Sequence, residues 1–249
     1  MSSVAIIARA FDPGQIFIEA KDDGHPIKLV RRTLCLIGGN WIGEAAKNDP
    51  NPLATVRREV CTEELSLEKP TVSTLELTLL DDQPAGAFEY KVPVNPVEIS
   101  PNDQDDLGFI KAEIWNTLAP FGTYLNTVTR EAMTAADPEN KRDGFTTLSC
   151  YWVSLLREGA WTRLERLQKK FGNLSNESIT LITSADEIVE KKTRGAFCHE
   201  QPLQAFFLSM GVQNAKNMTI TPQQTSVYAG PALASYDDYL AKYEIAKHP

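Results

Sequence analysis

The order of strand-like and helical segments constrains this chain more than any single motif. Residues 3–11, 15–21 and 27–39 are rich in β-branched and apolar side chains, and the turn sequences DPG and DDGHP separate them. This pattern predicts three strands with hairpin-like connections. A loop rich in proline and asparagine follows. A helix is then predicted from Pro52 to about Leu65, because proline suits the first turn of a helix.

The rest of the chain also mixes strand-like and helical patterns. Further strands are predicted at residues 71–82, 87–94 and 145–156, and residues 177–192 are typical of a strand that leads into a helix. Helices are predicted at about 106–140, with Pro120 and Gly122 kinking or splitting the helix, and at 157–172, 201–211 and 235–247. Strands, one acidic helix, more strands and then helices predict a mixed α/β (α+β) layer fold and not a regular βαβ alternation.

Charge and cysteine usage exclude several classes of partner. The net charge of −8 argues against a general nucleic-acid surface, which needs a dense basic patch. No apolar run approaches the roughly 20 residues of a membrane span, so no membrane partner is expected. The four cysteines are far apart in apolar surroundings, which predicts reduced thiols and a cytoplasmic location. The N-terminal sequence meets Pro13 early and predicts a strand, not a signal peptide.

The predicted helix at Pro52–Leu65 carries three glutamates with different positions on its surface. At about 100° per residue, Glu59 and Glu63 lie on one polar face, whereas Glu64 lies about 140° from Glu59. Two carboxylates four residues apart can share a cation, and Mg²⁺ is usually held by one or two carboxylates together with waters and phosphates. A solvated acidic helix face is the alternative interpretation.

The sequence around this helix resembles the Nudix box. Gly38 (or Gly39) and Glu44 match the glycine and the first glutamate of that motif, Arg58-Glu59-Val60 matches its R-E-aliphatic segment, and Glu63 matches the second residue of its E-E pair. The resemblance implies a Nudix-like mixed sheet sandwiched by helices. It also implies that Glu59 and Glu63 hold Mg²⁺ or Mn²⁺, and that Arg58 fixes the loop by pairing with Glu44.

The chain departs from the motif at three places. The spacing between Glu44 and Arg58 is longer than in the motif, Thr62 replaces the first glutamate of the E-E pair, and Leu65 replaces a glycine. A shifted frame would match the sequence EELSL better but would take Arg58-Glu59 out of register. Against a minimal Nudix domain, the resemblance implies a domain at 1–212 with a helical insertion at about 103–141, and a C-terminal tail at 213–249 with a short helix.

The leading functional hypothesis is a metal-dependent hydrolase of a nucleoside diphosphate-linked substrate, with Glu59, Glu63 and Arg58 as its catalytic residues. The alternative is a Nudix-fold module that binds a nucleotide or a protein without catalysis, and a third interpretation is an unrelated mixed α/β protein. The general base is left open, with four candidates in segments that could border a cleft: Glu158, Glu187, His199 and Glu200. Trp41 is expected either to stack on a nucleobase or to cap the core. The insertion and the tail could serve dimerisation, so a homodimer is among the expected partners.

Overall fold

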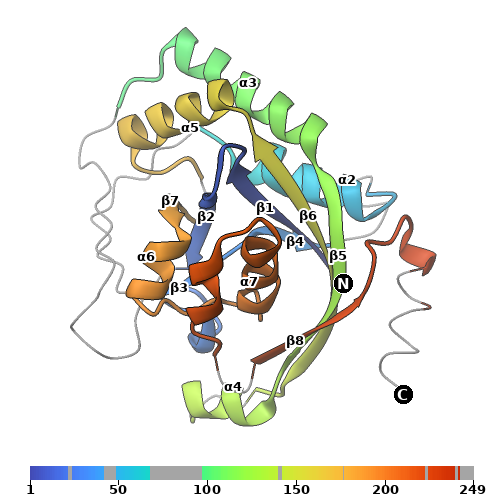
Figure 1. The fold of residues 1–249 in the computed structure, drawn as a ribbon. Coiled ribbons are helices and arrows are strands. Elements are labelled where there is room, and N and C mark those ends of the chain that lie inside the picture. Colours follow the sequence, from blue (N-terminus) through green and yellow to red (C-terminus); the bar gives the residue numbers. More distant parts are fainter. Residues whose placement is uncertain are drawn as a thin grey trace.

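A computed structural model describes residues 1–21, 24–41, 49–67, 97–139, 142–175, 177–221, 224–238 and 241. These residues form one large sheet with helices on both of its faces (Figure 1). The predicted mixed α/β fold is therefore confirmed. Among the residues described, no helix is long and apolar enough to cross a membrane.

The described part of the chain contributes eight strands to the sheet. In chain order they are β1 (Ser2–Arg9), β2 (Asp12–Lys21), β3 (Thr33–Cys35), β4 (Ile37–Asn40), β5 (Ala119–Val128), β6 (Phe145–Leu156), β7 (Ile179–Ser184) and β8 (Gln224–Gly230). The strands β3, β2, β1, β6, β5 and β8 lie side by side in that order, while β4 also pairs with β1 and β7 with β2. The pairing of β1 with β6 is parallel and the others are antiparallel, so the sheet is mixed.

Helices cover the two faces of the sheet unequally (Figure 1). In chain order they are η1 (Lys28–Val30), α2 (Pro52–Arg58), the π-helical turn η2 (Glu59–Glu64), α3 (Pro101–Thr117), α4 (Arg130–Ala136), α5 (Glu158–Phe171), α6 (Ala185–Glu190), α7 (Glu200–Ser209) and η3 (Gln213–Asn217). Residues of α2, η2, α3 and α5 share one apolar cluster with the sheet, and residues of α6 and α7 share another.

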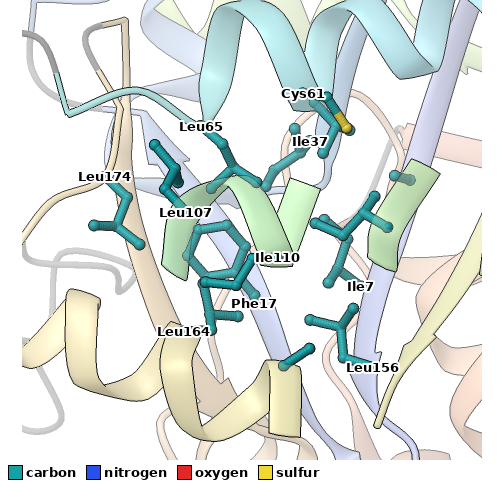
Figure 2. Packing of buried hydrophobic residues seen from close by; sticks show 14 of the residues in the cluster. Ile7, Phe17, Ile37, Cys61, Leu65, Leu107, Ile110, Leu156, Leu164 and Leu174 are labelled. Carbon is teal, nitrogen blue, oxygen red and sulfur yellow. The ribbon is translucent and has the colours of Figure 1, made fainter. Parts of the chain in front are cut away.

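The first of these clusters fixes the glutamate-bearing helix against the sheet (Figure 2). Phe17 of β2, Ile110 of α3, Leu164 of α5 and Leu65, which follows η2, are each 1% exposed or less. Burying an apolar side chain of this size stabilises a fold by roughly 1.5–3 kcal/mol. At the start of α2, the Ser3 hydroxyl of β1 donates to the Pro52 carbonyl at 2.6 Å and accepts from the Trp152 indole of β6 at 2.9 Å.

Most of the predicted elements are found. The first strands, the helix that begins at Pro52, the amphipathic helix α5 and the strand-to-helix segment β7–α6 are confirmed. The helix α7 ends just before Gly211, whose φ of +84° is a conformation that glycine adopts without strain. The predicted third strand at 27–39 is instead a 3₁₀ turn followed by the short strands β3 and β4.

The prediction of helix across 106–140 is wrong in its central part. Residues Ala119–Val128 form β5, which pairs with β6 and β8 inside the sheet. The predicted insertion at about 103–141 therefore contains a sheet strand between α3 and α4. Pro120 lies at a shift in register between β5 and β6 and marks no helix kink. The strand β8, in the predicted tail, was not predicted.

Three predictions fall outside the described residues. They are the strands at 71–82 and 87–94 and the position of Glu44; of the last helix at 235–247, the structure describes only residues 235–238 and 241.

Candidate functional site

The candidate site is built on the connection from β4 into α2 and η2. The Asn51 side chain accepts from the Ala54 backbone N–H at 2.9 Å, and Pro52 occupies the first turn of α2. At Glu59 the helix changes to π geometry, and the Leu65 N–H bonds the Val60 carbonyl five residues earlier at 3.0 Å. Single π turns inside α-helices are frequent at functional sites.

Arg58 gathers three carboxylates around its guanidinium. Its Nη2 contacts Asp49 at 2.8 Å, and its Nη1 contacts Glu59 at 2.7 Å and Glu63 at 2.9 Å. The structure thus brings together the three predicted site residues Arg58, Glu59 and Glu63. The interpretation of the glutamates as a simply solvated face is wrong, because their side chains are only 16% and 21% exposed and both bind Arg58.

Asp49 is a loop acid that pairs with Arg58, whereas Glu44, to which the resemblance assigned such a pairing, lies outside the described residues. The Asp49 carboxylate accepts from Arg58 Nε at 3.0 and 3.1 Å and from the Thr55 hydroxyl at 3.1 Å, and its side chain is only 2% exposed. Because the single hydroxyl proton of Thr55 goes to Asp49, the hydroxyl of Tyr236 donates to Thr55, at 2.6 Å.

Trp41 is held in the same network. Its ring stacks on Tyr236 with centroids 4.3 Å apart, and its indole N–H donates to the Asp49 carbonyl at 2.9 Å. Of the two expected roles, the structure supports packing against the protein over stacking on a base. Tyr236 therefore contacts both Trp41, which follows β4, and Thr55 of α2.

The Glu59 carboxyl lies directly against the backbone of Gly39. A methyl group built on Gly39 would lie 2.2 Å from the Glu59 carboxyl atoms, so only glycine leaves room for this arrangement. Burial raises the pKa of Glu59 to about 7; Arg58 opposes this shift, while Glu63 and Glu177 add to it. The ion pair with Arg58 therefore does not fully stabilise the negative charge at Glu59.

Glu64 points to a different part of the site, next to two residues of β2. It is 6% exposed and accepts a hydrogen bond from the Ser178 hydroxyl. Burial raises the pKa of Glu64 to about 8, and the negative charge of Glu19 adds to this shift. Glu19 itself is 3% exposed and forms an ion pair with Lys21.

A pocket of about 260 Å³ opens where β1 changes its antiparallel partner. Residues 2–5 of β1 pair with β4, whereas residues 7–9 pair with β2, so the strands diverge. The pocket is lined by Glu19, Lys21 and the Gly38–Asn40 backbone and also by Phe145, Phe197 and His199. Cys35, which lines it too, contacts the His199 ring at 3.6 Å. Because Glu59 lies against Gly39, its carboxyl lies behind the wall of this pocket.

The four candidates for a general base separate by burial and partners. Glu158 is 49% exposed and pairs with Arg9, and Glu187 binds Thr183 and Lys191. Glu200 is 3% exposed, and its carboxylate accepts from Gly195 N–H and from Thr221 and so fixes two backbone segments. Of the four, His199 alone lines the pocket described above.

Three residues of the site, Glu19, Lys21 and Asp49, were missed by sequence reasoning. Glu19 and Lys21 lie two residues apart in β2, directly after the apolar segment Ile16–Ile18, and residues at that spacing share one face of a strand. A charged pair on a face that also carries the buried Phe17 was the available signal. Asp49 had no such signal, because its distance from Arg58 depends on the fold of the loop.

The donor chemistry of the site fits Mg²⁺ or Mn²⁺, whereas the present arrangement is not a complete metal site. Carboxylates with raised pKa values are groups whose negative charge a cation would stabilise. Among the described residues, however, no group of three or more His, Cys, Asp or Glu side chains is arranged to hold a metal ion. A cation here would need Glu59 and Glu63 to reorient from Arg58 or would need oxygen ligands from a substrate.

Comparisons with known proteins give little further information. No family model matches the chain, and no curated protein matches it in sequence. Among solved structures, it is similar to the crystal structure of a NUDIX hydrolase from Alicyclobacillus acidocaldarius, at 11% identity and a TM-score of 0.41, over 89% of this chain and 97% of that chain. A TM-score at this level does not assign a fold family, so the Nudix hypothesis rests on the residues of the site.

Proposed function

We propose that the chain is a Nudix-like, divalent-cation-dependent hydrolase that acts on a nucleoside diphosphate-linked small molecule. The observation that carries the proposal is the position of Glu59, whose partly buried carboxyl lies behind the pocket wall at Gly39 with its pKa raised to about 7. Buried negative charge at the edge of a pocket is typical of a site that binds a cation together with an anionic substrate.

The π turn supports a single alignment of the chain with the Nudix box, in which both Arg58-Glu59 and the later segment EELSL match the motif. The chain has one residue more than the motif between Arg58-Glu59 and Glu63-Glu64, and a π turn accommodates one extra residue in a helix. Thr62, which is exposed, is then the extra residue, and Glu63 and Glu64 take the two positions of the E-E pair. In this frame Glu64 joins Glu59 and Glu63 as a metal-ligand candidate.

Each residue then has a defined task. When bound, Mg²⁺ or Mn²⁺ would neutralise the diphosphate oxygens and help activate the attacking water. Arg58 joins the loop acid Asp49 to the helix acids, so the loop and the helix keep one relative position. Gly39 has no side chain, which leaves room for the Glu59 carboxyl directly against the backbone that lines the pocket.

The experiment is hydrolysis of a panel of nucleoside diphosphate derivatives with Mg²⁺ or Mn²⁺, using wild type, Glu59→Gln and the exposed-residue control Glu190→Gln. We expect metal-dependent turnover in wild type and in the control, and a loss of at least about 100-fold in Glu59→Gln. Turnover that persists in EDTA or in Glu59→Gln would contradict the proposal.

A binding module without catalysis is the second candidate, and one observation favours it. The Arg58 guanidinium binds the Glu59 and Glu63 carboxylates that the sequence assigned to the metal. In that case nucleotides would bind without turnover, and Mn²⁺ would not raise the thermal unfolding midpoint.

A further inference from the structure

The helix α3 lies at the outer edge of the molecule, next to α5 (Figure 1). One side of α3 packs into the core, and the other side is exposed. At about 100° per residue, six exposed residues lie within about 100° of one another around the helix. This α3 face consists of Pro101, Gln104, Asp105, Gly108, Ala112 and Trp115. Because Asp105 is its one charged residue, the α3 face is less polar than the solvent-facing side of a surface helix usually is.

Two small residues, Gly108 and Ala112, occupy the middle of the α3 face. Glycine destabilises the interior of a helix relative to alanine. A Cβ built on Gly108 would have no described atom within 4 Å. The described part of the chain therefore contains nothing that requires glycine at this position. Two small residues one turn apart allow a second helix backbone to approach closely.

Two exposed aromatic rings, Phe109 and Trp115, flank the small residues. Each is 44% exposed, and each is covered by an arginine from a neighbouring helix. The Arg163 guanidinium lies 4.3 Å from the centroid of Phe109, and the Arg57 guanidinium lies 4.6 Å from that of Trp115. Rings that the free protein already holds in place lose little conformational freedom when another molecule packs against them.

The two ends of the α3 face carry opposite charges. Asp105 lies toward the N-terminal end, and Arg57 lies on Trp115 at the C-terminal end, where it donates to the Trp115 carbonyl at 2.9 Å. Within the described residues, neither Asp105 nor Arg57 has an ion-pair partner. A two-fold axis between Gly108 and Ala112 would set Asp105 of one copy opposite Trp115 of the other, because each lies three positions outside that pair. Each Asp105 would then lie beside the Arg57 of the second copy.

We propose that the α3 face binds the same face of a second copy of this chain, with the two α3 helices antiparallel. Gly108 packs against Ala112 at the centre, and two Asp105–Arg57 ion pairs form at the ends. The antiparallel arrangement also places the opposite ends of the two helix dipoles side by side. A second copy fits better than an unrelated partner, because the two unpaired charges of this face complement each other under a two-fold axis.

The size and place of the interface set its strength and its relation to the site. One pair of helices buries less than the roughly 800 Å² per partner of a standard interface, so we expect a dissociation constant in the micromolar range. Arg57 and Trp115 also line a groove that contains Arg58 and Glu63, so the second copy borders the candidate site. The dimer does not depend on the proposed hydrolysis.

The test is sedimentation velocity of the full chain between about 1 and 200 μM. We expect the average mass of wild type to rise from the chain mass of 27.6 kDa toward twice that value. Gly108→Lys places a long cationic side chain at the centre of the α3 face and should weaken association by at least about tenfold. Because the space around Gly108 is open and lysine is the better helix former, its thermal unfolding midpoint in dilute solution should be no lower than that of wild type.

The matched control is Gln213→Lys, which adds the same charge at an exposed residue of η3. This element packs with α6 and α7 and shares no apolar cluster with α3, so Gln213→Lys should associate as wild type does.

Charge reversal tests the two-fold register. Asp105→Arg sets two arginines against each other at each end of the interface, and Arg57→Asp sets two aspartates against each other, so each variant should associate about tenfold more weakly than wild type. An equimolar mixture of the two variants restores both ion pairs in the heterodimer and should associate more tightly than either variant alone. A change in folding could weaken each variant, but it would not produce this recovery.

Three results would overturn the inference. If wild type stays monomeric over the whole range, the α3 face is solvated or takes a different partner. If Gly108→Lys dimerises as wild type does, the dimer uses another surface. If the mixture associates no better than the single variants, Asp105 and Arg57 do not meet across a two-fold axis. Failure of the proposed hydrolysis is distinguishable from all three, because none of these measurements uses metal or substrate.

Discussion

Buried acids at two places in this molecule have pKa values shifted in opposite directions. At the start of α3, Asp103 is fully buried, contacts Arg166 at 2.9 Å and also pairs with Lys170 of α5. It forms a capping box with Ser100 as well. Although burial works against its charge, hydrogen bonds from Lys170, Ser100 and Arg166 hold the pKa of Asp103 below its ordinary value.

The site cluster on η2 differs because, within the described part of the chain, it has fewer cations than acids. Arg58 binds the three carboxylates of Asp49, Glu59 and Glu63, and Lys21 lies beside both Glu19 and Glu64. The pKa values of Glu59 and Glu64 are consequently raised by burial and by like charges. Acids that the protein neutralises itself hold two helices together, whereas acids left without enough cations are suited to bind one from outside.

The largest expected effect on stability is at Asp103, whose charge is neutralised by Arg166 and Lys170. Asp103→Ala should lower the free energy of unfolding by about 3 kcal/mol at pH 7, because it removes a helix cap and the buried carboxylate that accepts charge-assisted hydrogen bonds from Lys170 and Arg166. Urea unfolding measures this change, and Asp105→Ala, at an exposed position in the same helix, is the control.

Because the folded-state pKa of Asp103 is lowered, the contribution of Asp103 to stability is complete above about pH 4. The difference between Asp103→Ala and wild type should shrink as the pH falls below that value. Equal stability of Asp103→Ala and Asp105→Ala at pH 7 would remove the contrast between the two clusters.

The site cluster should respond to pH in the opposite direction. The pKa of Glu64 is raised to about 8. Its contribution to stability is therefore complete below the unfolded value of about 4.3 and is lost as the pH rises through 8. Glu64→Gln, which stays neutral, should be more stable than wild type by on the order of 2 kcal/mol at pH 8 and about equal to it at pH 5. Thermal unfolding at both pH values measures this, with Glu190→Gln as the control. If Glu64→Gln is destabilised equally at pH 5 and pH 8, Glu64 is a structural acid like Asp103.

The same variant connects stability to the proposed function. In wild type, Mn²⁺ should raise the unfolding midpoint at pH 8, because the cation stabilises the ionised glutamates. In Glu64→Gln that increase should be smaller, although the variant is the more stable protein without metal. Opposite effects of one substitution on stability and on metal binding are expected where a site is held in a destabilised state for function.

Local patterns predicted much of this fold, because they depend on neighbours in the chain. Alternation of apolar residues predicted β1 and β2, the amphipathic pattern predicted α5, and Pro52 predicted the start of α2. The local pattern predicts helix at β5, because the strand character of β5 depends on pairing with β6 and β8, which come from distant parts of the sequence.

The site was predicted in part for the same reason. A helical wheel placed Glu59 beside Glu63 correctly, since Arg58 binds both. The wheel assumed a uniform α-helix, however, and could not include the π turn that permits a single motif frame with Glu64. Asp49, Glu19 and His199 come together only through the folding of loops and strands, so no local spacing predicted their roles.

The smallest expected effect tests whether Asp49 behaves like Asp103. Asp49 is an acid of the site, yet its charge is neutralised by Arg58. The Thr55 hydroxyl also donates to Asp49, and the Tyr236 hydroxyl donates to Thr55. Tyr236→Phe removes the hydroxyl that donates to Thr55 while keeping the ring stacked on Trp41. The free energy of unfolding should fall by about 1 kcal/mol, because one buried hydrogen bond is lost and the Asp49–Arg58 pair is kept.

The control is Tyr228→Phe, at a residue that is 58% exposed, which should change the free energy of unfolding by less than about 0.5 kcal/mol. If Tyr236→Phe costs no more than Tyr228→Phe, the C-terminal contact does not support the loop. If it costs as much as Asp103→Ala, the Asp49–Arg58 pair depends on Tyr236 for its position, and the neutralised part of the site extends from the helix to the C-terminal segment.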